Sequence, residues 1–406
     1  MAILFFVLAL VAAYTNRSML FEQRTSANQY RALQAAEAAE AGVEWALSML
    51  NTGRSDDNCQ PTAHATEPPF RDRYLAIAPD TGAVRPTGTL GADGGSDRWP
   101  TCVFDGTGWD CRCPTDGVGT PPAPAGGGVF PAFRIRFVDI GGAPPGAVRL
   151  EVNGCTRLAD ECLDFPVTGV GGEGRATHRV PVALRGGLAA PPVAAVTVRG
   201  TLDAGGAALG AFNGDADAGG IAILAGGAVD GPALRVGSAP GTPLSGANVA
   251  DDTGLAGLPD GERFFTSSFA LPSASYRAQP GAVVLDCATV PCSGDRVRGV
   301  AERHPGHVLW ADGDVDLGAG AEIGTPTAPV LLVVTGDIAL DTTLHGLLYG
   351  RAGAWSGAGT VRGALMVEGD YAGTAAYDVV YDPGVLQRLR WRTGSFVRVP
   401  GSWRDY

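Results

Sequence analysis

Apolar residues dominate the start of the chain and then become periodic. The first 14 residues carry no charge, and a helix-favouring stretch continues from Thr15 to Leu50. As a helix, the uncharged run of 14 residues spans about 21 Å. It is shorter than the helix of roughly 20 apolar residues that is needed to cross a bilayer core. From Leu33 onward, apolar residues recur at every third or fourth position, as on one helix face. This face comprises Leu33, Ala36, Ala39, Val43, Ala46, Leu47 and Leu50.

Three interpretations of residues 1–50 compete. A cleavable secretory signal would end at small residues such as Ala12 and Ala13, but no basic residue precedes the apolar core. A simple single-span anchor fits residues 1–14 but gives the periodic stretch after Leu33 no role. We therefore predict that residues 1–50 form one helix that serves as both membrane anchor and assembly element.

Charged residues are also ordered along this predicted helix. Arg17, Arg24 and Arg31 recur every seven residues, and Glu37 and Glu44 follow with Glu40 between them. Acidic residues three and four apart in one helix repel each other. A parallel neighbour shifted along the axis would set arginines of one molecule against glutamates of the next, which predicts a helical polymer with these residues setting its register. A solvated charged face is the alternative.

Alternating apolar and charged residues predict strands in the middle of the chain. Residues 132–140 (AFRIRFVDI) and 147–152 (AVRLEV) alternate as half-buried strands do. Residues 177–184 and 193–202 continue the pattern. In residues 51–128, by contrast, Pro, Gly and Asp are frequent and periodicity is weak, so few strands are expected there.

A looser repeat follows residue 300. Residues 308–317, 330–340 and 364–372 each place a Gly-Asp turn after an apolar strand. Short strands of this kind gain a core by stacking as coils of a β-solenoid. Residues 205–261 are low in complexity and 264–276 form an isolated aromatic patch, so this region reads as an insertion or linker.

Composition narrows the classes of function. The chain has 60 Gly and 29 Pro among 406 residues, with 7% aromatic residues, which favours short strands and turns after residue 50. The formal net charge is −12. Such a charge disfavours a basic face that binds nucleic acid, and we predict no nucleic-acid partner.

Eight cysteines lie beyond the predicted helix, and an even number in an exported chain implies disulfides. Short spacings predict that Cys155 pairs with Cys162 and that Cys287 pairs with Cys292. The remaining four pair among themselves in an order that the sequence leaves open. These four are Cys59, Cys102, Cys111 and Cys113. A zinc site is the alternative, but no CxxC motif occurs.

Two acidic segments are candidates for a calcium site. Asp215 and Asp217 follow Asn213 as in a calcium loop, but Ala218 replaces the turn Gly and Leu224 the bidentate Glu. The second segment contains Asp312, Asp314 and Asp316, although turn aspartates commonly bond their own backbone. We predict no cofactor, with calcium as the alternative.

An enzyme of the β-helix class would need acidic residues that converge with a basic one. Asp312, Asp314 and Asp316 with Arg351 offer these groups, but nothing in the sequence brings them together. His304 and His307 flank Pro305 and Gly306, which excludes a helical metal pair. No nucleophile elbow or P-loop is present. We predict a non-catalytic protein.

The run "AILFFVLALVAAYTNRSMLFEQRTSANQYRALQAAEAAEAGVEWAL" resembles the N-terminal region of PilX-type minor pilins of the type IV pilus. It combines an apolar start with an "A-x-Q-A-A-E-A" block at residues 32–38. The chain departs from pilins in general: no basic leader precedes the run, and if Met1 is the first mature residue, the fifth is Phe5 instead of Glu. The resemblance therefore implies a minor pilin and not a shaft-forming one.

The resemblance also implies an architecture. We expect an α+β fold with a helix at 1–50 and a disulfide-pinned, loop-rich segment with a pilin-like sheet at 51–204. An insertion or linker at 205–299 and a β-solenoid-like region at 300–406 would follow. Residues that would pass from lipid into the filament core are Ile3, Leu4, Phe5, Phe6, Leu8, Leu10 and Val11.

Implied partners are other minor pilins, the major pilin, a tip adhesin and the inner-membrane assembly platform. The protein would reside in the inner membrane before assembly and at the pilus tip afterwards, where it would help prime the fibre. Two alternatives remain: a minor pseudopilin of type II secretion, and a membrane-anchored β-helix protein that binds or cleaves carbohydrate.

Overall fold

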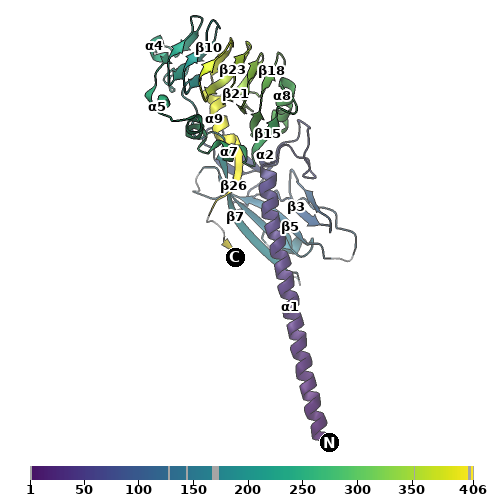
Figure 1. Ribbon diagram of the computed structural model, residues 1–406. Helices are drawn as coiled ribbons and strands as arrows, with labels where there is room; N and C mark the ends of the chain where they lie inside the picture. The colour runs from purple at the N-terminus through teal and green to yellow at the C-terminus, as the bar shows by residue number, and fades with distance from the viewer. Residues whose placement is uncertain are drawn as a thin grey trace.

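The molecule is elongated, with one long helix leading into a body of strands (Figure 1). The computed structural model describes residues 2–126, 129–142, 145–166, 173–351, 353–400 and 404–405. Helix α1 (Ala2–Leu50) projects from the body for most of its length. This confirms the coarser part of the predicted α+β fold, a long N-terminal helix followed by a β-rich region.

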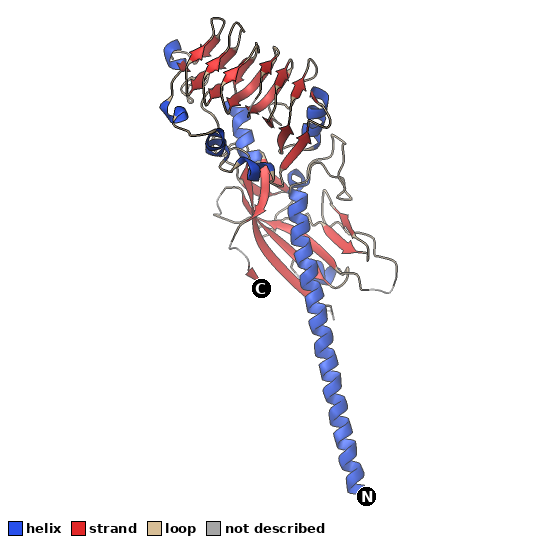
Figure 2. Cartoon of the chain, viewed as in Figure 1, coloured by secondary structure: helices blue, strands red, loops and turns tan. Residues whose placement is uncertain are grey.

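An antiparallel sheet lies beside the last turns of α1 (Figure 2). Its strand order is β26-β7-β6-β5-β3-β4, with a short β27 paired to β7. The strands are β3 (Thr101–Phe104), β4 (Trp109–Arg112), β5 (Ala132–Val138), β6 (Ala147–Cys155), β7 (Arg175–Gly186), β26 (Gly394–Arg398) and β27 (Arg404–Asp405). Three of them, β5, β6 and β7, lie where the alternating pattern predicts strands.

Residues 51–128 form connecting structure around this sheet. Besides β3 and β4 they contain helix α2 (Phe70–Tyr74) and a small hairpin of β1 (Leu75–Ile77) and β2 (Val84–Pro86). Helix α3 (Asp160–Leu163) lies farther along the chain, after β6. The Pro- and Gly-rich composition of residues 51–128 thus corresponds to short elements joined by turns.

All eight cysteines form disulfides. Cys155–Cys162 and Cys287–Cys292 pair as their short spacings predict. The order that the sequence leaves open is Cys59–Cys113 and Cys102–Cys111. The second of these joins β3 to β4 at directly paired positions. Cross-links of this kind stabilise a loop-rich segment mainly by restricting its unfolded state.

Beyond the antiparallel sheet, short strands pair in parallel in three adjoining sheets, which we call the parallel stack. The first sheet contains β15 (Ala282–Asp286), β17 (Val308–Asp312), β19 (Val330–Val334), β21 (Thr343–Gly350), β23 (Thr360–Val367), β25 (Asp378–Tyr381), β10 (Gly210–Asn213), β13 (Arg235–Ser238), β8 (Val196–Val198), β11 (Ile223–Ala225) and β14 (Asn248–Val249). The second contains β16 (Cys292–Ser293), β18 (Val315–Leu317), β20 (Ile338–Leu340) and β22 (Trp355–Ser356). The third contains β24 (Tyr371–Ala372), β9 (Leu202–Asp203) and β12 (Val229–Asp230).

One column of aligned side chains runs through the first sheet and supplies much of the core. Each member is paired in register with the next, and all are at most 1% exposed. The column is Leu309, Leu332, Leu348, Leu365, Val196 and Ile223. Because each short strand has little apolar surface of its own, the stack gains its core only when neighbouring strands align.

The stack is assembled from two separate stretches of sequence. Val196 pairs with Leu365, so that strands from residues 196–249 continue the stack begun by strands from residues 282–381. This differs from the predicted insertion or linker at 205–299, because β10 to β14 are integral to the stack. Some of the small residues that made this region look low in complexity are buried in the core, among them Ala211 and Ala222.

Helices cover parts of the stack. Helices α6 (Gly261–Phe269) and α9 (Pro383–Arg392) pack on the outer side of the first sheet, where their apolar residues meet Trp310 and Tyr349. The predicted isolated aromatic patch is therefore part of a core, because Phe264, Phe265 and Tyr276 are buried there. The other helices are α4 (Leu244–Ala247), α5 (Thr253–Ala256), α7 (Ser273–Arg277) and α8 (Gly294–Arg303).

The last turns of α1 are fastened to the antiparallel sheet by small residues. Ala35, Ala39 and Val43 are fully buried against β5, β6 and β7. A Cβ on Gly154 of β6 would lie 2.3 Å from the carbonyl oxygen of Ala35, so only glycine allows this approach. The predicted periodic face is buried only in part: Ala39, Val43, Ala46 and Leu50 are buried, Ala36 and Leu47 are half-buried, and Leu33 is 58% exposed.

Candidate functional site

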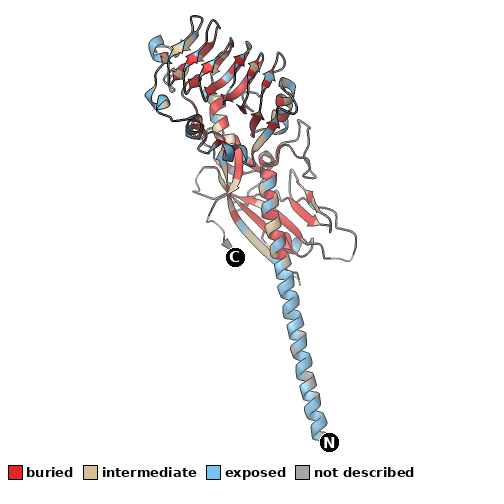
Figure 3. Cartoon of the chain, viewed as in Figure 1, coloured by how far each residue is buried: buried red, intermediate tan, exposed pale blue. Residues whose placement is uncertain are grey.

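The first two-thirds of α1 expose apolar side chains along the whole projecting helix (Figure 3). Ile3 is 82% exposed and Phe5 is 78% exposed. A continuous exposed apolar surface on a folded protein marks an interaction surface. We call this segment, residues 3–33, the free helix; its last turn meets the body, because a Cβ on Gly174 would lie 2.1 Å from the carbonyl oxygen of Arg31. The predicted filament-contact residues all lie exposed on it: Ile3, Leu4, Phe5, Phe6, Leu8, Leu10 and Val11.

The apolar surface continues past the uncharged start, because Tyr14, Met19, Phe21 and Tyr30 are also exposed. Within the described part of the chain, no helix combines the length and the apolar character needed to cross a membrane.

The predicted register residues fall into two groups. Arg17, Arg24, Arg31 and Glu37 are exposed on α1. Glu44, by contrast, accepts a hydrogen bond from Arg398 of β26 at 2.6 Å. This intramolecular ion pair was not foreseen, since a local pattern does not reveal which distant strand returns to the helix.

Arg398 joins two acidic residues of α1. Its guanidinium also donates to Glu40 at 3.0 Å, and Nδ1 of His178 on β7 lies 3.3 Å from the other Glu40 oxygen. The acidic stretch of α1 therefore holds the C-terminal strand β26 and the neighbouring strand β7 to the helix. This polar contact lies just above the free helix.

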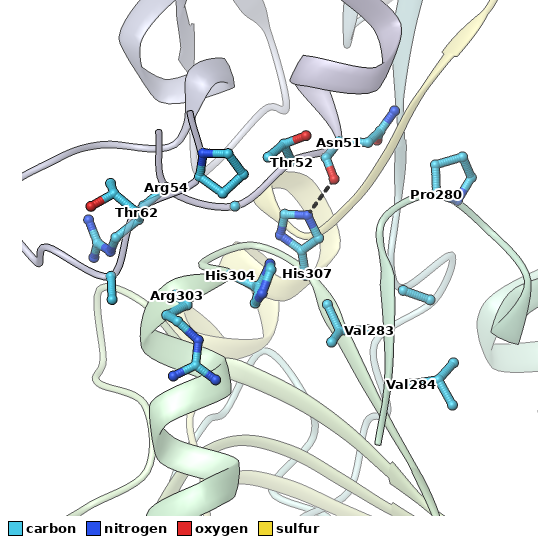
Figure 4. A pocket seen from close by; sticks show the side chains of 14 residues that line it. Asn51, Thr52, Arg54, Thr62, Pro280, Val283, Val284, Arg303, His304 and His307 are labelled. Atoms are coloured by element: carbon cyan, nitrogen blue, oxygen red, sulfur yellow. Dashed lines mark hydrogen bonds between the residues drawn. The ribbon is translucent and has the colours of Figure 1, made fainter. Parts of the chain in front are cut away.

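A pocket of about 680 Å³ opens where α1 ends against the parallel stack (Figure 4). It is lined by Asn51 to Arg54 after the helix, by Val283 and Val284 of the edge strand β15, and by Arg303 and His304 at the end of α8. At its base, Nε2 of His307 donates to the backbone oxygen of Asn51 at 2.9 Å. This hydrogen bond ties the end of the helix to the stack.

His307 is buried and neutral. Burial, with the Arg71 guanidinium close by, lowers the pKa of His307 to about 4. Nη2 of Arg71 lies 3.3 Å from Nδ1, so with Nε2 protonated Nδ1 accepts from Arg71. The same Nη2 donates to the Pro305 carbonyl at 2.6 Å. These contacts join Asn51, Arg71 and His307 at the junction, a structural role that the sequence did not predict for His307.

Most of the calcium candidates have partners within the protein. Oδ1 of Asp314 accepts from the Asp337 backbone at 2.8 Å, and Asp312 binds Arg277 at 3.1 Å. Asp215 accepts from the backbone of Asp217 at 3.0 Å. Asp316 and Asp314 line a pocket of about 490 Å³ beside the second sheet. Among the described residues, no group of three or more His, Cys, Asp or Glu side chains is arranged to hold a metal ion.

The acidic residues weighed for catalysis do not converge on Arg351 either. Nε of Arg351 donates to Glu368 at 2.7 Å, and Tyr349 donates to the same carboxylate at 3.0 Å. Glu262 of α6 lies 3.5 Å from the guanidinium. This cluster fastens helix α6 to the stack.

Comparisons with known proteins add little to this picture. No family model matches the sequence, and no curated protein is detectably similar to it. Among solved structures, the chain is similar to the competence-associated pilin ComZ from Thermus thermophilus, with 11% identity, a TM-score of 0.24, and coverage of 93% of this chain and 97% of that one. A TM-score this low does not establish a common fold, so the functional argument rests on the geometry of the chain.

Proposed function

We propose that the protein is a pilin-like subunit that enters a filament through its free helix. The observation that carries this proposal is the exposure of apolar side chains along residues 3–33, on a helix whose last turns are fastened to the body. A projecting apolar helix is stable in water only when other apolar surface covers it. Packing with parallel helices of neighbouring subunits would supply that cover.

The finer role that we propose is that of a PilX-type minor pilin at or near the tip of a type IV pilus. In this role the protein would reside in the inner membrane before assembly and help prime the fibre. Its partners would be other minor pilins, the major pilin, a tip adhesin and the assembly platform. The resemblance of residues 2–47 to such pilins supports this assignment.

The body would act in recognition and not in catalysis. We interpret the parallel stack as a β-solenoid that is presented away from the filament core, because it lies at the opposite end of the molecule from the free helix (Figure 1). A pseudopilin of type II secretion would share the same helix, and the two roles differ in the assembly that contains the protein.

A substitution on the free helix tests the proposal. Leu8 is 59% exposed. Leu8→Asp should therefore leave the unfolding temperature of the body unchanged. In the filament, the buried carboxylate would meet apolar surface, and we expect at least a tenfold lower amount of the protein in sheared fibres, measured by immunoblot.

The matched control is Gln23→Asp, which places the same charge at an exposed polar position of α1. It should leave incorporation near the level of the unaltered protein. Equal recovery of the Leu8→Asp and unaltered proteins in the fibre fraction would refute a helix-packed filament role.

A further inference from the structure

A second pocket, of about 350 Å³, lies where the segment after α1 meets the parallel stack and α9. Four arginines line it, from three different parts of the chain: Arg54, Arg71, Arg388 and Arg392. Asp72 is the single acidic residue among the described residues of its wall. The formal charge of the wall is therefore four minus one, or +3, in a chain whose net charge is −12.

Three of these arginines are held by neutral groups. Arg71 is 1% exposed and donates to the carbonyl oxygens of Pro305 at 2.6 Å and Gly394 at 3.2 Å. Arg54 donates to the backbone of Glu302 at 2.7 Å. Arg388 donates to the carbonyl of Gly384 in its own helix at 3.2 Å. Within the described ranges, none of the three lies within 4.0 Å of a carboxylate.

The fourth arginine, Arg392, is paired with the one acidic residue of the wall, so the wall keeps its excess of positive charge. Arg392 lies 3.5 Å from Asp72, so it uses the one acidic group of the wall. Burial and the neighbouring Arg392 lower the pKa of Arg71 to about 10, while Asp72 opposes the shift. The guanidinium remains charged at neutral pH. Asp72 therefore faces more than one guanidinium, and an anionic ligand would offset the positive charge that remains in the wall.

We propose that this pocket binds a ligand carrying a phosphate group. Guanidinium groups offer paired N–H donors that match the oxygens of phosphate, and several together favour a dianion over a single carboxylate. The volume is at the lower end of small-ligand pockets, which suits a phosphate monoester or inorganic phosphate and excludes a large ligand. Gly306 of the wall permits a close approach of the backbone to an arginine, because a Cβ there would lie 2.2 Å from Nη2 of Arg71.

Calorimetric titration of the whole 406-residue chain in detergent tests this proposal. The titrants are inorganic phosphate, glycerol 3-phosphate and acetate, each against sodium chloride of equal ionic strength. We expect saturable binding of a phosphate species and at least tenfold weaker binding of acetate. Tighter binding of glycerol 3-phosphate identifies a phosphate-bearing molecule as the ligand, whereas tighter binding of inorganic phosphate identifies the free anion.

Substitutions locate the binding. Arg388→Gln and Arg392→Gln should each raise the dissociation constant for the phosphate species about tenfold, as expected for loss of one charge-assisted hydrogen bond. The control is Arg390→Gln in the same helix, whose guanidinium lies 4.4 Å from the ring centroid of Trp391 and does not line the pocket. An unchanged constant for Arg388→Gln in a chain with unaltered circular dichroism, or an effect no larger than that of chloride, overturns the proposal.

Discussion

At the scale of single residues, His307 couples the end of α1 to the parallel stack. Its imidazole donates to Asn51 and accepts from Arg71, an arrangement open only to the neutral ring. The pKa of His307 is about 4 in the folded chain, below its ordinary value of 6.5. Between these pH values the unfolded chain binds more protons, so stability is complete above about pH 6.5 and falls as the pH drops toward 4.

We predict that His307→Gln reduces this pH dependence. Glutamine can donate to Asn51 and accept from Arg71 without titrating. The unaltered chain should lose up to about 3 kcal/mol of unfolding free energy between pH 7 and pH 4 through His307. Urea unfolding followed across this range should show a smaller loss for His307→Gln. His64→Gln, at an exposed histidine, is the matched control; parallel curves for the His307→Gln and unaltered chains would contradict the prediction.

The residue scale also separates what the sequence reveals from what it conceals. The short spacing correctly pairs Cys155 with Cys162, because the few residues between them keep the two cysteines close together. Alternation correctly places β5, but it assigns Arg134 to solvent, whereas this residue is fully buried and bound to Asp160 at 2.7 Å. A polar partner brought from outside the strand allows this burial, and a local pattern does not contain that partner.

At the scale of elements, the contact of α1 with the antiparallel sheet depends on glycine. A Cβ on Gly154 would lie 2.3 Å from the Ala35 oxygen and 2.4 Å from the Ala39 nitrogen, both backbone atoms that cannot turn aside. A Cβ on Gly42 of α1 would lie 2.7 Å from the Val152 side chain and 2.8 Å from the Phe133 ring. Helix and sheet therefore approach more closely than side chains would permit.

We predict that Gly154→Ala forces α1 away from the sheet. Overpacking of this kind typically costs about 1–3 kcal/mol of unfolding free energy, which chemical denaturation measures. Gly108→Ala is the matched control, because a Cβ there meets nothing within 4 Å. Equal stabilities of the two variants would show that the helix can shift without cost.

The pairing of elements was less accessible from sequence than the elements themselves. The runs at 308–317 and 330–340 do stack in parallel, and apolar residues pair in register between them, such as Leu309 with Leu332 and Val315 with Ile338. Nothing near Val196, however, indicates that its strand pairs with one 169 residues away at Leu365. Which strands pair across that distance in sequence depends on the packing of the whole core. The turns between strands also differ in length, so the sequence shows no regular repeat for the parallel stack.

At the scale of the whole molecule, the C-terminal part of the chain returns to the last turns of α1. After the stack, α9 leads into β26, which rejoins the antiparallel sheet beside β7, and Arg398 then binds Glu40 and Glu44 of α1. The chain thus passes from the antiparallel sheet into the parallel stack and back again, so that the sheet beside the last turns of α1 contains strands from residues 101–186 and from residues 394–405. As a result, Glu44 has an intramolecular partner in Arg398, whereas Glu37 of the same acidic stretch is exposed.

The two glutamates should therefore respond differently to charge reversal. Glu37 is exposed and, in the part of the chain that the structure describes, forms no ion pair. Glu37→Arg should leave the unfolding free energy unchanged and lower filament incorporation, because it would repel arginines of a shifted neighbour. Glu44→Arg should instead lower the unfolding free energy by up to about 1 kcal/mol, since its pair with Arg398 is partly exposed. Denaturation of the purified chains and immunoblots of sheared fibres measure the two effects. Unchanged fibre levels for Glu37→Arg would remove the register role from this residue and leave filament contact to the apolar side chains of the free helix.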